Sequence, residues 1–140
     1  MPGEITFKSH NRNTTKFRKL FSELFDSPFT SLMEHEAMIS MNVDGKPVAL
    51  CCLEIEGFEI IRGDVYHSLD IELFEVAENE RGKGYADIFL DHLYKRYTPY
   101  RVTLRHREDD DGESRDFWKY HGFHFIDRRT RSMELKLVKR

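Results

Sequence analysis

Residues 69–97, LDIELFEVAENERGKGYADIFLDHLYKRY, decide how this chain folds, because a strand, a glycine-rich turn and an amphipathic helix follow one another directly. Leu69–Val76 reads as the strand. Helical spacing of apolar residues predicts a helix from Gly84 to Tyr97, and Pro99 stops it. The predicted buried stripe of this helix consists of Tyr85, Ile88, Phe89, Leu93 and Tyr97.

The turn between strand and helix has the composition of an anion site. Gly82 and Gly84 leave the backbone free of side chains, so the N–H groups from Gly82 to Ala86 can point together at a phosphate. Arg81 and Lys83 add positive charge. The turn lacks the Lys-Ser/Thr ending of a P-loop and does not complete a dinucleotide fingerprint. An ordinary glycine-containing loop with solvated basic residues is the alternative interpretation.

A second motif follows downstream, Asp111-Gly-Glu-Ser-Arg-Asp-Phe-Trp-Lys-Tyr-His-Gly-Phe123. With the run Val76-(four residues)-Arg81-Gly-Lys-Gly84-Tyr-Ala86, it resembles the acyl-CoA-binding motif and the helix-Gly-Phe motif of the GNAT superfamily of acetyltransferases. The order and separation of the two motifs fit, and the resemblance covers nearly the whole chain. It implies a single acetyltransferase domain over residues 1–140 and acetyl-CoA as co-substrate.

The resemblance also implies how acetyl-CoA is held. The N–H groups of the turn would bind its pyrophosphate, the backbone of Val76 would face the pantetheine amides, and Arg81 and Lys83 would lie near the phosphates. The cofactor-binding residues expected on this basis are Val76, Arg81, Gly82, Lys83, Gly84, Tyr85, Ala86 and Phe117.

The rest of the chain alternates strands with helices. Helices are predicted at Phe17–Phe25, with Asn13 or Thr14 as cap, and at Ser114–His121. Further strands are predicted at Ile5–Lys8, Met38–Val43, Val48–Ile55, Arg101–His106, Phe123–Ile126 and Met133–Val138. The fold class is therefore α/β. The resemblance implies a mixed, mostly antiparallel sheet with a central parallel strand pair that splays apart and is flanked by helices.

Composition is that of a packed protein: 39% of the 140 residues are hydrophobic and 13% aromatic. No apolar run is long enough to span a bilayer and no signal-peptide pattern is present, so the expected compartment is the cytoplasm. Cys51 and Cys52 lie in an apolar run and are interpreted as reduced core residues. His121 and His124 are interpreted as packing residues, and no metal site is predicted.

The chemistry implied by the resemblance is attack of an amine on a thioester. An alkyl amine has a pKa near 10.4, so its deprotonation at neutral pH costs roughly 4 kcal/mol, and a nearby carboxylate can take the proton. Asp70 and Glu72 lie two apart on the strand and should face the same side. Asp70 matches the acidic position that many relatives place eleven residues before the motif arginine, and Glu72 is the second choice. The alternative is that both belong to a solvated strand face.

The general acid departs from the superfamily pattern. Many relatives have tyrosine four residues before the helix-ending glycine, but this chain has Trp118, which cannot donate a proton to a thiolate. Tyr120 is a candidate, although it lies roughly 200° away around the helix axis and reads equally as a surface or packing residue. A thiol pKa of about 8.5 also lets the thiolate leave without an acid.

Acidic residues dominate the segment from Glu54 to Glu80. Against Arg62 alone it carries Glu54, Glu56, Glu59, Asp64, Asp70, Glu72, Glu75, Glu78 and Glu80, while the whole chain has a net charge of only −3. Such a segment attracts cationic amines and repels nucleic acid, although a solvated acidic face that maintains solubility is the competing explanation.

These features predict an N-acetyltransferase that acts on the primary amine of a cationic small molecule. A protein lysine or N-terminus is the alternative acceptor, and a non-catalytic acyl-CoA-binding sensor or interaction module is the alternative class. Neither nucleic acid nor membrane is an expected partner, and a homodimer is left open.

Overall fold

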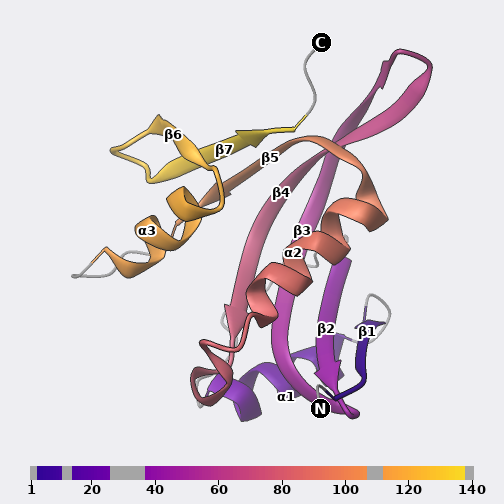
Figure 1. Ribbon diagram of the computed structural model, residues 1–140, viewed down its shortest axis with the longest axis vertical. Coiled ribbons are helices and arrows are strands. Elements are labelled where there is room, and N and C mark those ends of the chain that lie inside the picture. Colours follow the sequence, from indigo (N-terminus) through magenta and orange to yellow (C-terminus); the bar gives the residue numbers. More distant parts are fainter. Residues whose placement is uncertain (1–2, 11–13, 26–36, 107–111, 138–140) are drawn as a thin grey trace. The chain divides into compact units, whose positions relative to one another are not determined.

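The structure is a computed structural model that describes residues 3–10, 14–25, 37–106 and 112–137 (Figure 1). The strands are β1 Ile5–Ser9, β2 Ala37–Val43, β3 Lys46–Ile61, β4 Asp64–Val76, β5 Pro99–Arg105, β6 His124–Asp127 and β7 Ser132–Lys136. The helices are α1 Thr14–Phe25, the 3-10 helix η1 Glu78–Glu80, α2 Tyr85–Tyr97 and α3 Glu113–Tyr120. The cap candidate Asn13 and the first residue of the second motif, Asp111, lie outside the described residues.

The strands form a mixed sheet. Within the described ranges, seven strands are hydrogen-bonded in the order β1-β2-β3-β4-β5-β7-β6. β4 and β5 pair in parallel over His67–Ile71, whereas the pairings of β1 with β2, β2 with β3, β5 with β7 and β6 with β7 are antiparallel. The predicted α/β fold class, with a mostly antiparallel sheet and a parallel pair around the glycine-rich turn, is confirmed.

Contacts group the chain into two compact units. The first unit comprises Met1–Glu54 and Leu73–Arg96, and the second comprises Ile55–Glu72 and Tyr97–Arg140. The long strands β3 and β4 each contribute residues to both units.

The first unit has an apolar layer on each face of its strands. Leu73 of β4 packs with α1, in a cluster built on Phe17 and Cys52. The next residue, Phe74, contacts Phe89 of α2, with ring centroids 5.2 Å apart. Because successive strand residues point to opposite faces, α1 and α2 cover opposite faces of these strands.

The two cysteines are both fully buried and both carry reduced thiols, which confirms their interpretation as reduced core residues. Burial raises the pKa of the Cys51 thiol well above its ordinary value, with a smaller contribution from Cys52. Both thiols are therefore packing groups.

In the second unit, α3 packs through Trp118, which is 6% exposed and meets the ring of Phe123 edge-on at 5.1 Å. Gly122, with φ of +93°, ends this helix. The N–H of Phe123 then donates to the Trp118 carbonyl at 3.0 Å, and the N–H of Gly122 donates to the Lys119 carbonyl at 3.0 Å. This arrangement is a glycine-terminated helix end, as the helix-Gly-Phe motif predicts.

Two elements differ from the sequence prediction. β3 extends to Ile61 and β4 starts at Asp64, so both strands are longer than predicted. They form a hairpin, which was not predicted, around the turn Arg62-Gly63 with φ of +53° and +87°. Its residues Phe58 and Ile60 are 66% and 68% exposed, so no buried face marks this arm in the sequence.

The predicted buried stripe of α2 is wrong at Ile88, which is exposed, and it omitted Leu90, which is buried. The helix is buried along Phe89, Leu90 and Leu93. Its buried stripe is rotated because α2 packs on aromatic side chains of β1 and β4, which the periodicity of the helix itself does not reveal. Among the described helices, none is long and apolar enough to cross a membrane.

Candidate active site

In the first unit, β4 leads directly into the glycine-rich turn. Its last residue is Val76, and the N–H of the following Ala77 donates to the Val48 carbonyl of β3 at 2.8 Å. η1 then reverses the chain, and the N–H of Arg81 donates to the Glu78 carbonyl at 3.3 Å. The start of the turn is thus anchored by backbone hydrogen bonds.

The backbone of the turn has the conformation that the glycines allow. Gly82 and Gly84 have φ of +79° and +82°, in the left-handed region that other residues rarely adopt. A Cβ added at either glycine would meet nothing within 4 Å. The backbone is therefore open to the approach of a ligand on that side.

The N–H groups of this turn are available as donors. In the part of the chain that the structure describes, the backbone N–H groups from Gly82 to Ala86 donate to no acceptor. The first bond of α2 is the one from the Ile88 N–H to the Gly84 carbonyl, at 3.3 Å. Orphan donors at a helix N-terminus, next to residues of positive φ, fit a phosphate or pyrophosphate group.

The two basic side chains of the turn are engaged with carboxylates of the same segment. Arg81 Nε donates to the Val76 carbonyl at 3.1 Å, and its Nη2 lies 3.4 Å from Glu75 Oε2. Lys83 Nζ donates to Glu80 Oε2 at 2.9 Å, and this hydrogen bond and the charge of Glu80 raise the pKa of the Lys83 ammonium. Each basic side chain of the turn thus has a carboxylate partner of its own.

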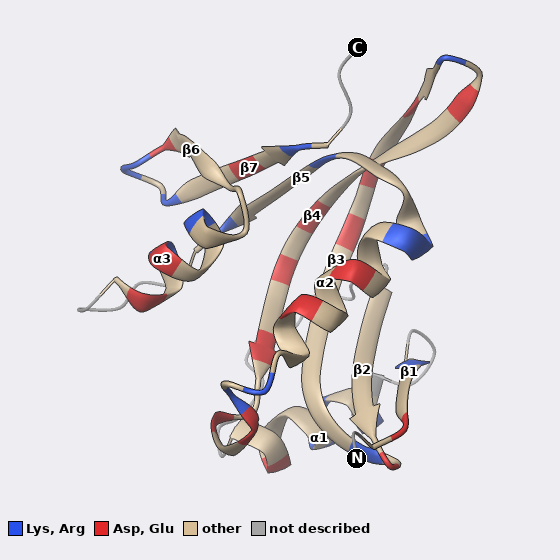
Figure 2. Cartoon of the chain, viewed as in Figure 1, with Lys and Arg blue, Asp and Glu red and all other residues tan. Residues whose placement is uncertain are grey.

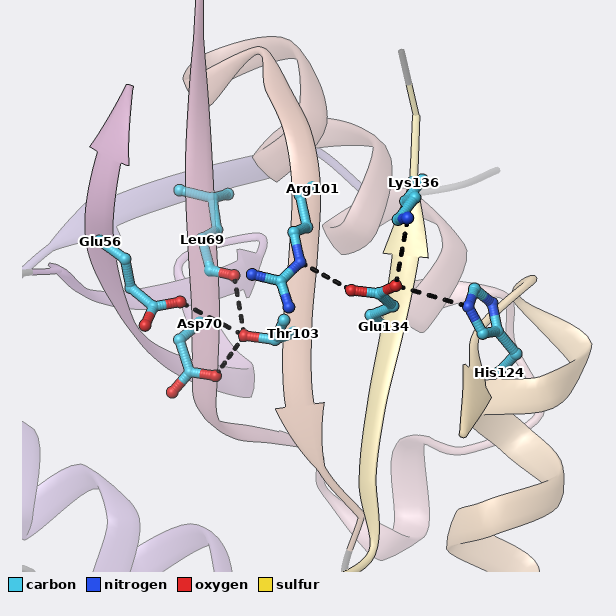
Figure 3. A network of polar contacts seen from close by, with 8 residues as sticks. All are labelled: Glu56, Leu69, Asp70, Arg101, Thr103, His124, Glu134 and Lys136. Atoms are coloured by element: carbon cyan, nitrogen blue, oxygen red, sulfur yellow. Dashed lines mark hydrogen bonds and ion pairs between the residues drawn. The ribbon is translucent and has the colours of Figure 1, made fainter. Parts of the chain in front are cut away.

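In the second unit, a polar network crosses β3, β4 and β5 (Figure 3). Asp70 is half-buried, and its Oδ1 lies 2.7 Å from the hydroxyl of Thr103, its direct partner in the parallel register. The same hydroxyl lies 3.4 Å from Glu56 Oε1. Glu72, two residues along β4, is exposed. The Thr103 contact holds the Asp70 carboxylate against the neighbouring strand β5.

A second group of charges lies on β5, β6 and β7 of the same unit. Arg101 Nε donates to Glu134 Oε2 at 2.7 Å, while His124 and Lys136 lie 3.6 and 3.7 Å from Glu134 Oε1. Burial opposes ionisation of Glu134, but the hydrogen bond and charge of Arg101, followed by Lys136 and His124, outweigh it and lower the pKa. Glu134 thus forms its shortest ion pair with Arg101.

Residues 6–123 match a sequence model of the acetyltransferase (GNAT) family, which covers both motifs. The chain belongs to this family. A search of curated proteins finds no sequence match to this acetyltransferase.

Solved structures with the same fold include YhhK from E. coli, solved bound to coenzyme A, at 12% identity and a TM-score of 0.71, covering 96% of this chain and 99% of that one. Naa50 from Arabidopsis thaliana, solved with the bisubstrate analogue CoA-Ac-MVNAL, has 13% identity and a TM-score of 0.63. The alignment covers 95% of this chain and 99% of Naa50. Ard1 from Thermoplasma volcanium has 18% identity and a TM-score of 0.64, and the alignment covers 99% of this chain and 100% of Ard1. Identities this low show the fold alone.

The helix α3 of this acetyltransferase presents its aromatic residues in different environments. Trp118, at the position where many relatives have tyrosine, is buried in the core of the second unit. Tyr120 is 83% exposed, and its ring lies 5.2 Å from that of His121. Phe117 is half-buried, with its ring 4.6 Å from His121. Trp118 therefore has a structural role, and Tyr120 remains the candidate proton donor on this helix.

The predicted site residues fall in both units. The first unit holds the cofactor candidates from Val76 to Ala86, and the second holds Asp70, Glu72, Phe117 and Tyr120. Candidates from Asp70 to Val76 share one strand, β4. Thr103, which contacts Asp70, was not among the candidates, because a parallel register depends on the intervening helix and has no local sequence signal.

Proposed function

We propose that this acetyltransferase uses acetyl-CoA to acetylate a primary amine, and that its acceptor is a cationic small molecule. The single observation that carries the first part is the cradle of orphan N–H groups from Gly82 to Ala86, which fits the pyrophosphate of the co-substrate. The family match over residues 6–123 includes parts of both compact units, which supports one acetyltransferase domain.

Acetyl-CoA supplies the acetyl thioester. The amine nitrogen attacks the carbonyl carbon, a C–N bond forms, the C–S bond breaks, and the sulfur leaves with the electron pair. In the proposed reaction Asp70 takes the proton lost by the amine, with Glu72 as the second choice. Tyr120 is the proposed proton donor to the sulfur, if that step requires one.

The preference for a cationic acceptor is supported by charge. Figure 2 shows acidic residues spaced along β3 and β4, the strands that also carry Glu56 and Asp70 of the polar network. Carboxylates on a half-exposed strand face raise the local concentration of cations. If this field guides the acceptor, kcat/KM for the best amine will fall as ionic strength rises. A salt-independent kcat/KM would argue for an acceptor recognised without charge.

An N-terminal α-amine is the second candidate acceptor. Naa50 of Arabidopsis thaliana, which shares the fold, is solved with an analogue that joins CoA to the peptide MVNAL. A ribosomal-protein-alanine N-acetyltransferase from Brucella melitensis also shares the fold, at 16% identity and a TM-score of 0.60. These likenesses favour peptide acceptors as the alternative to test.

Thiol release from acetyl-CoA, measured across a panel of amines, tests the proposal. The panel contains a polyamine, an aminoglycoside, a lysine side-chain analogue and short peptides with free N-termini. The proposal predicts the highest kcat/KM with the polyamine or aminoglycoside. A higher kcat/KM with the peptides would indicate a protein acetyltransferase instead. Binding of acetyl-CoA without thiol release for any amine would indicate a non-catalytic binding module.

A further inference from the structure

Thr103 of β5 lies at the centre of the polar network in the second unit (Figure 3). It is paired with Asp70 in the parallel register of β4 and β5. Its Oγ1 lies 2.7 Å from Asp70 Oδ1, 3.4 Å from Glu56 Oε1 and 3.4 Å from the Leu69 carbonyl oxygen. The hydroxyl is thus surrounded by oxygens on three sides.

Only one of these oxygens can receive the proton of the hydroxyl, because threonine carries a single O–H donor. The ionised carboxylates and the carbonyl only accept. The 2.7 Å contact is typical of a short bond to a charged acceptor, whereas 3.4 Å lies beyond the usual range for O–H···O. Thr103 therefore donates to Oδ1 of Asp70.

This bond occupies one of the two carboxylate oxygens of Asp70. Throughout the ranges that the structure describes, no side chain other than Thr103 donates to this carboxylate. Figure 3 shows its second oxygen pointing away from Thr103. The hydrogen bond restrains the side-chain rotamer. Oδ1 accepts from the strand partner, and Oδ2 has no side-chain donor within the described ranges.

We propose that Thr103 is a positioning residue for the transfer reaction: it fixes the Asp70 carboxylate so that Oδ2 receives the proton of the acceptor amine. This inference rests on the proposed function, and in particular on Asp70 as the base. Thr103 acts through Asp70 and does not itself touch the substrate.

The test compares Thr103→Val, which keeps the shape of the side chain, and Thr103→Ser, which keeps the hydroxyl, in the natural chain and in the Asp70→Asn background. Thr103→Ala is a second variant without the hydroxyl, in case the valine variant folds poorly. Each protein is assayed for kcat and KM with the best amine of the panel and for acetyl-CoA affinity by calorimetry. Urea unfolding monitors the fold.

In the natural background, Thr103→Val is expected to lower kcat about tenfold and leave acetyl-CoA affinity unchanged, because one hydrogen bond to a charged group is lost. Thr103→Ser is expected to restore most of the rate. In the Asp70→Asn background, Thr103→Val is expected to have no further effect, since the residue through which it acts is already altered.

Three results would overturn the inference. An equal loss from Thr103→Val in both backgrounds would show a structural role that is independent of Asp70. A normal kcat in both hydroxyl-free variants, while Asp70→Asn is impaired, would refute the positioning role of Thr103 but not the role of Asp70 as the base. A normal kcat in Asp70→Asn would refute the base itself and Thr103 with it.

Discussion

At the scale of single residues, Asp70 differs from Glu72 in burial. Both lie on β4, two residues apart, so their side chains point to the same face of the strand. Asp70 is half-buried and bonded to Thr103, while Glu72 is exposed. A base must be held where the amine arrives, and a fixed carboxylate loses less entropy in the transition state than a mobile one. The preference for Asp70 over Glu72 and the catalytic role of either residue both stay predictions.

Asp70→Asn keeps the shape of the side chain and removes its basicity. It is expected to lower kcat by roughly 10²-fold or more and to leave acetyl-CoA affinity unchanged. Steady-state kinetics with the best amine of the panel and calorimetric titration of acetyl-CoA measure the two quantities. Glu72→Gln is the matched control, and a larger loss in that variant would move the base to Glu72.

His10 gives the protein a specific pH dependence of stability. Its ring Nε2 lies 2.8 Å from the Ser40 hydroxyl, and burial, followed by the charges of Lys8 and Lys16, lowers its pKa below the ordinary value of 6.5. The unfolded chain therefore binds this proton more tightly than the folded protein. The contribution of the neutral His10 ring to the free energy of unfolding is fully present above pH 6.5 and is lost as the pH falls through the lowered pKa.

Urea unfolding at pH 7.5 and pH 5.5 measures this dependence, and the free energy of unfolding is expected to be smaller at pH 5.5. His10→Asn is expected to reduce the difference between the two pH values. His92, whose pKa is lowered chiefly by burial and then by Arg96, acts in the same direction, so the single variant will retain part of it. An unchanged difference in His10→Asn would show that His10 is protonated equally in both states.

At the scale of elements, the end of α2 is held by a residue distant in sequence. The Nδ1 of His67 lies 2.7 Å from the carbonyl oxygen of Tyr97, the last residue of the helix. Because a carbonyl only accepts, Nδ1 must carry the proton. The backbone N–H of His67 also donates to the Thr98 carbonyl at 3.0 Å. The start of the β4–β5 pairing is thus tied to the end of the helix that connects these strands.

His67→Ala removes one of these bonds and is expected to lower the free energy of unfolding by about 1 kcal/mol. His67→Asn, whose amide can donate at a similar position, is expected to lose less. Urea unfolding of both variants tests this. Equal stability of the alanine variant and the natural protein would mean that water replaces the ring at the Tyr97 carbonyl without cost.

The elements that the sequence predicts best are those with one buried face and a local stop signal. The helix after the turn and the helix before Gly122 were predicted to within one residue at either end, because periodicity, Pro99 and the glycine define them. The exposed arm of the β3–β4 hairpin was missed because Phe58 and Ile60 face solvent. The contact between Thr103 and Asp70 could not be predicted, since it depends on the register of strands that are joined by α2.

At the scale of the whole molecule, the chain is only weakly acidic in total but strongly acidic between Glu54 and Glu80. The structure shows that part of this charge is compensated locally, since Arg81 and Lys83 pair with Glu75 and Glu80. Because the basic side chains of the turn pair locally, the proposed binding of acetyl-CoA depends on the backbone N–H groups from Gly82 to Ala86.

Calorimetric titration of acetyl-CoA into the natural protein, Gly84→Glu and Gly45→Glu tests that dependence most directly. Both glycines have a positive φ, +82° and +81°, and open space where a Cβ would lie, so the two substitutions carry a similar backbone cost of about 1–2 kcal/mol. Gly84→Glu places a bulky anion against the pyrophosphate and is expected to remove most of the affinity, roughly 100-fold or more. Gly45→Glu, in the β2–β3 turn, is expected to bind as the natural protein does. Normal binding by Gly84→Glu, or an equal loss in both variants, would contradict the account.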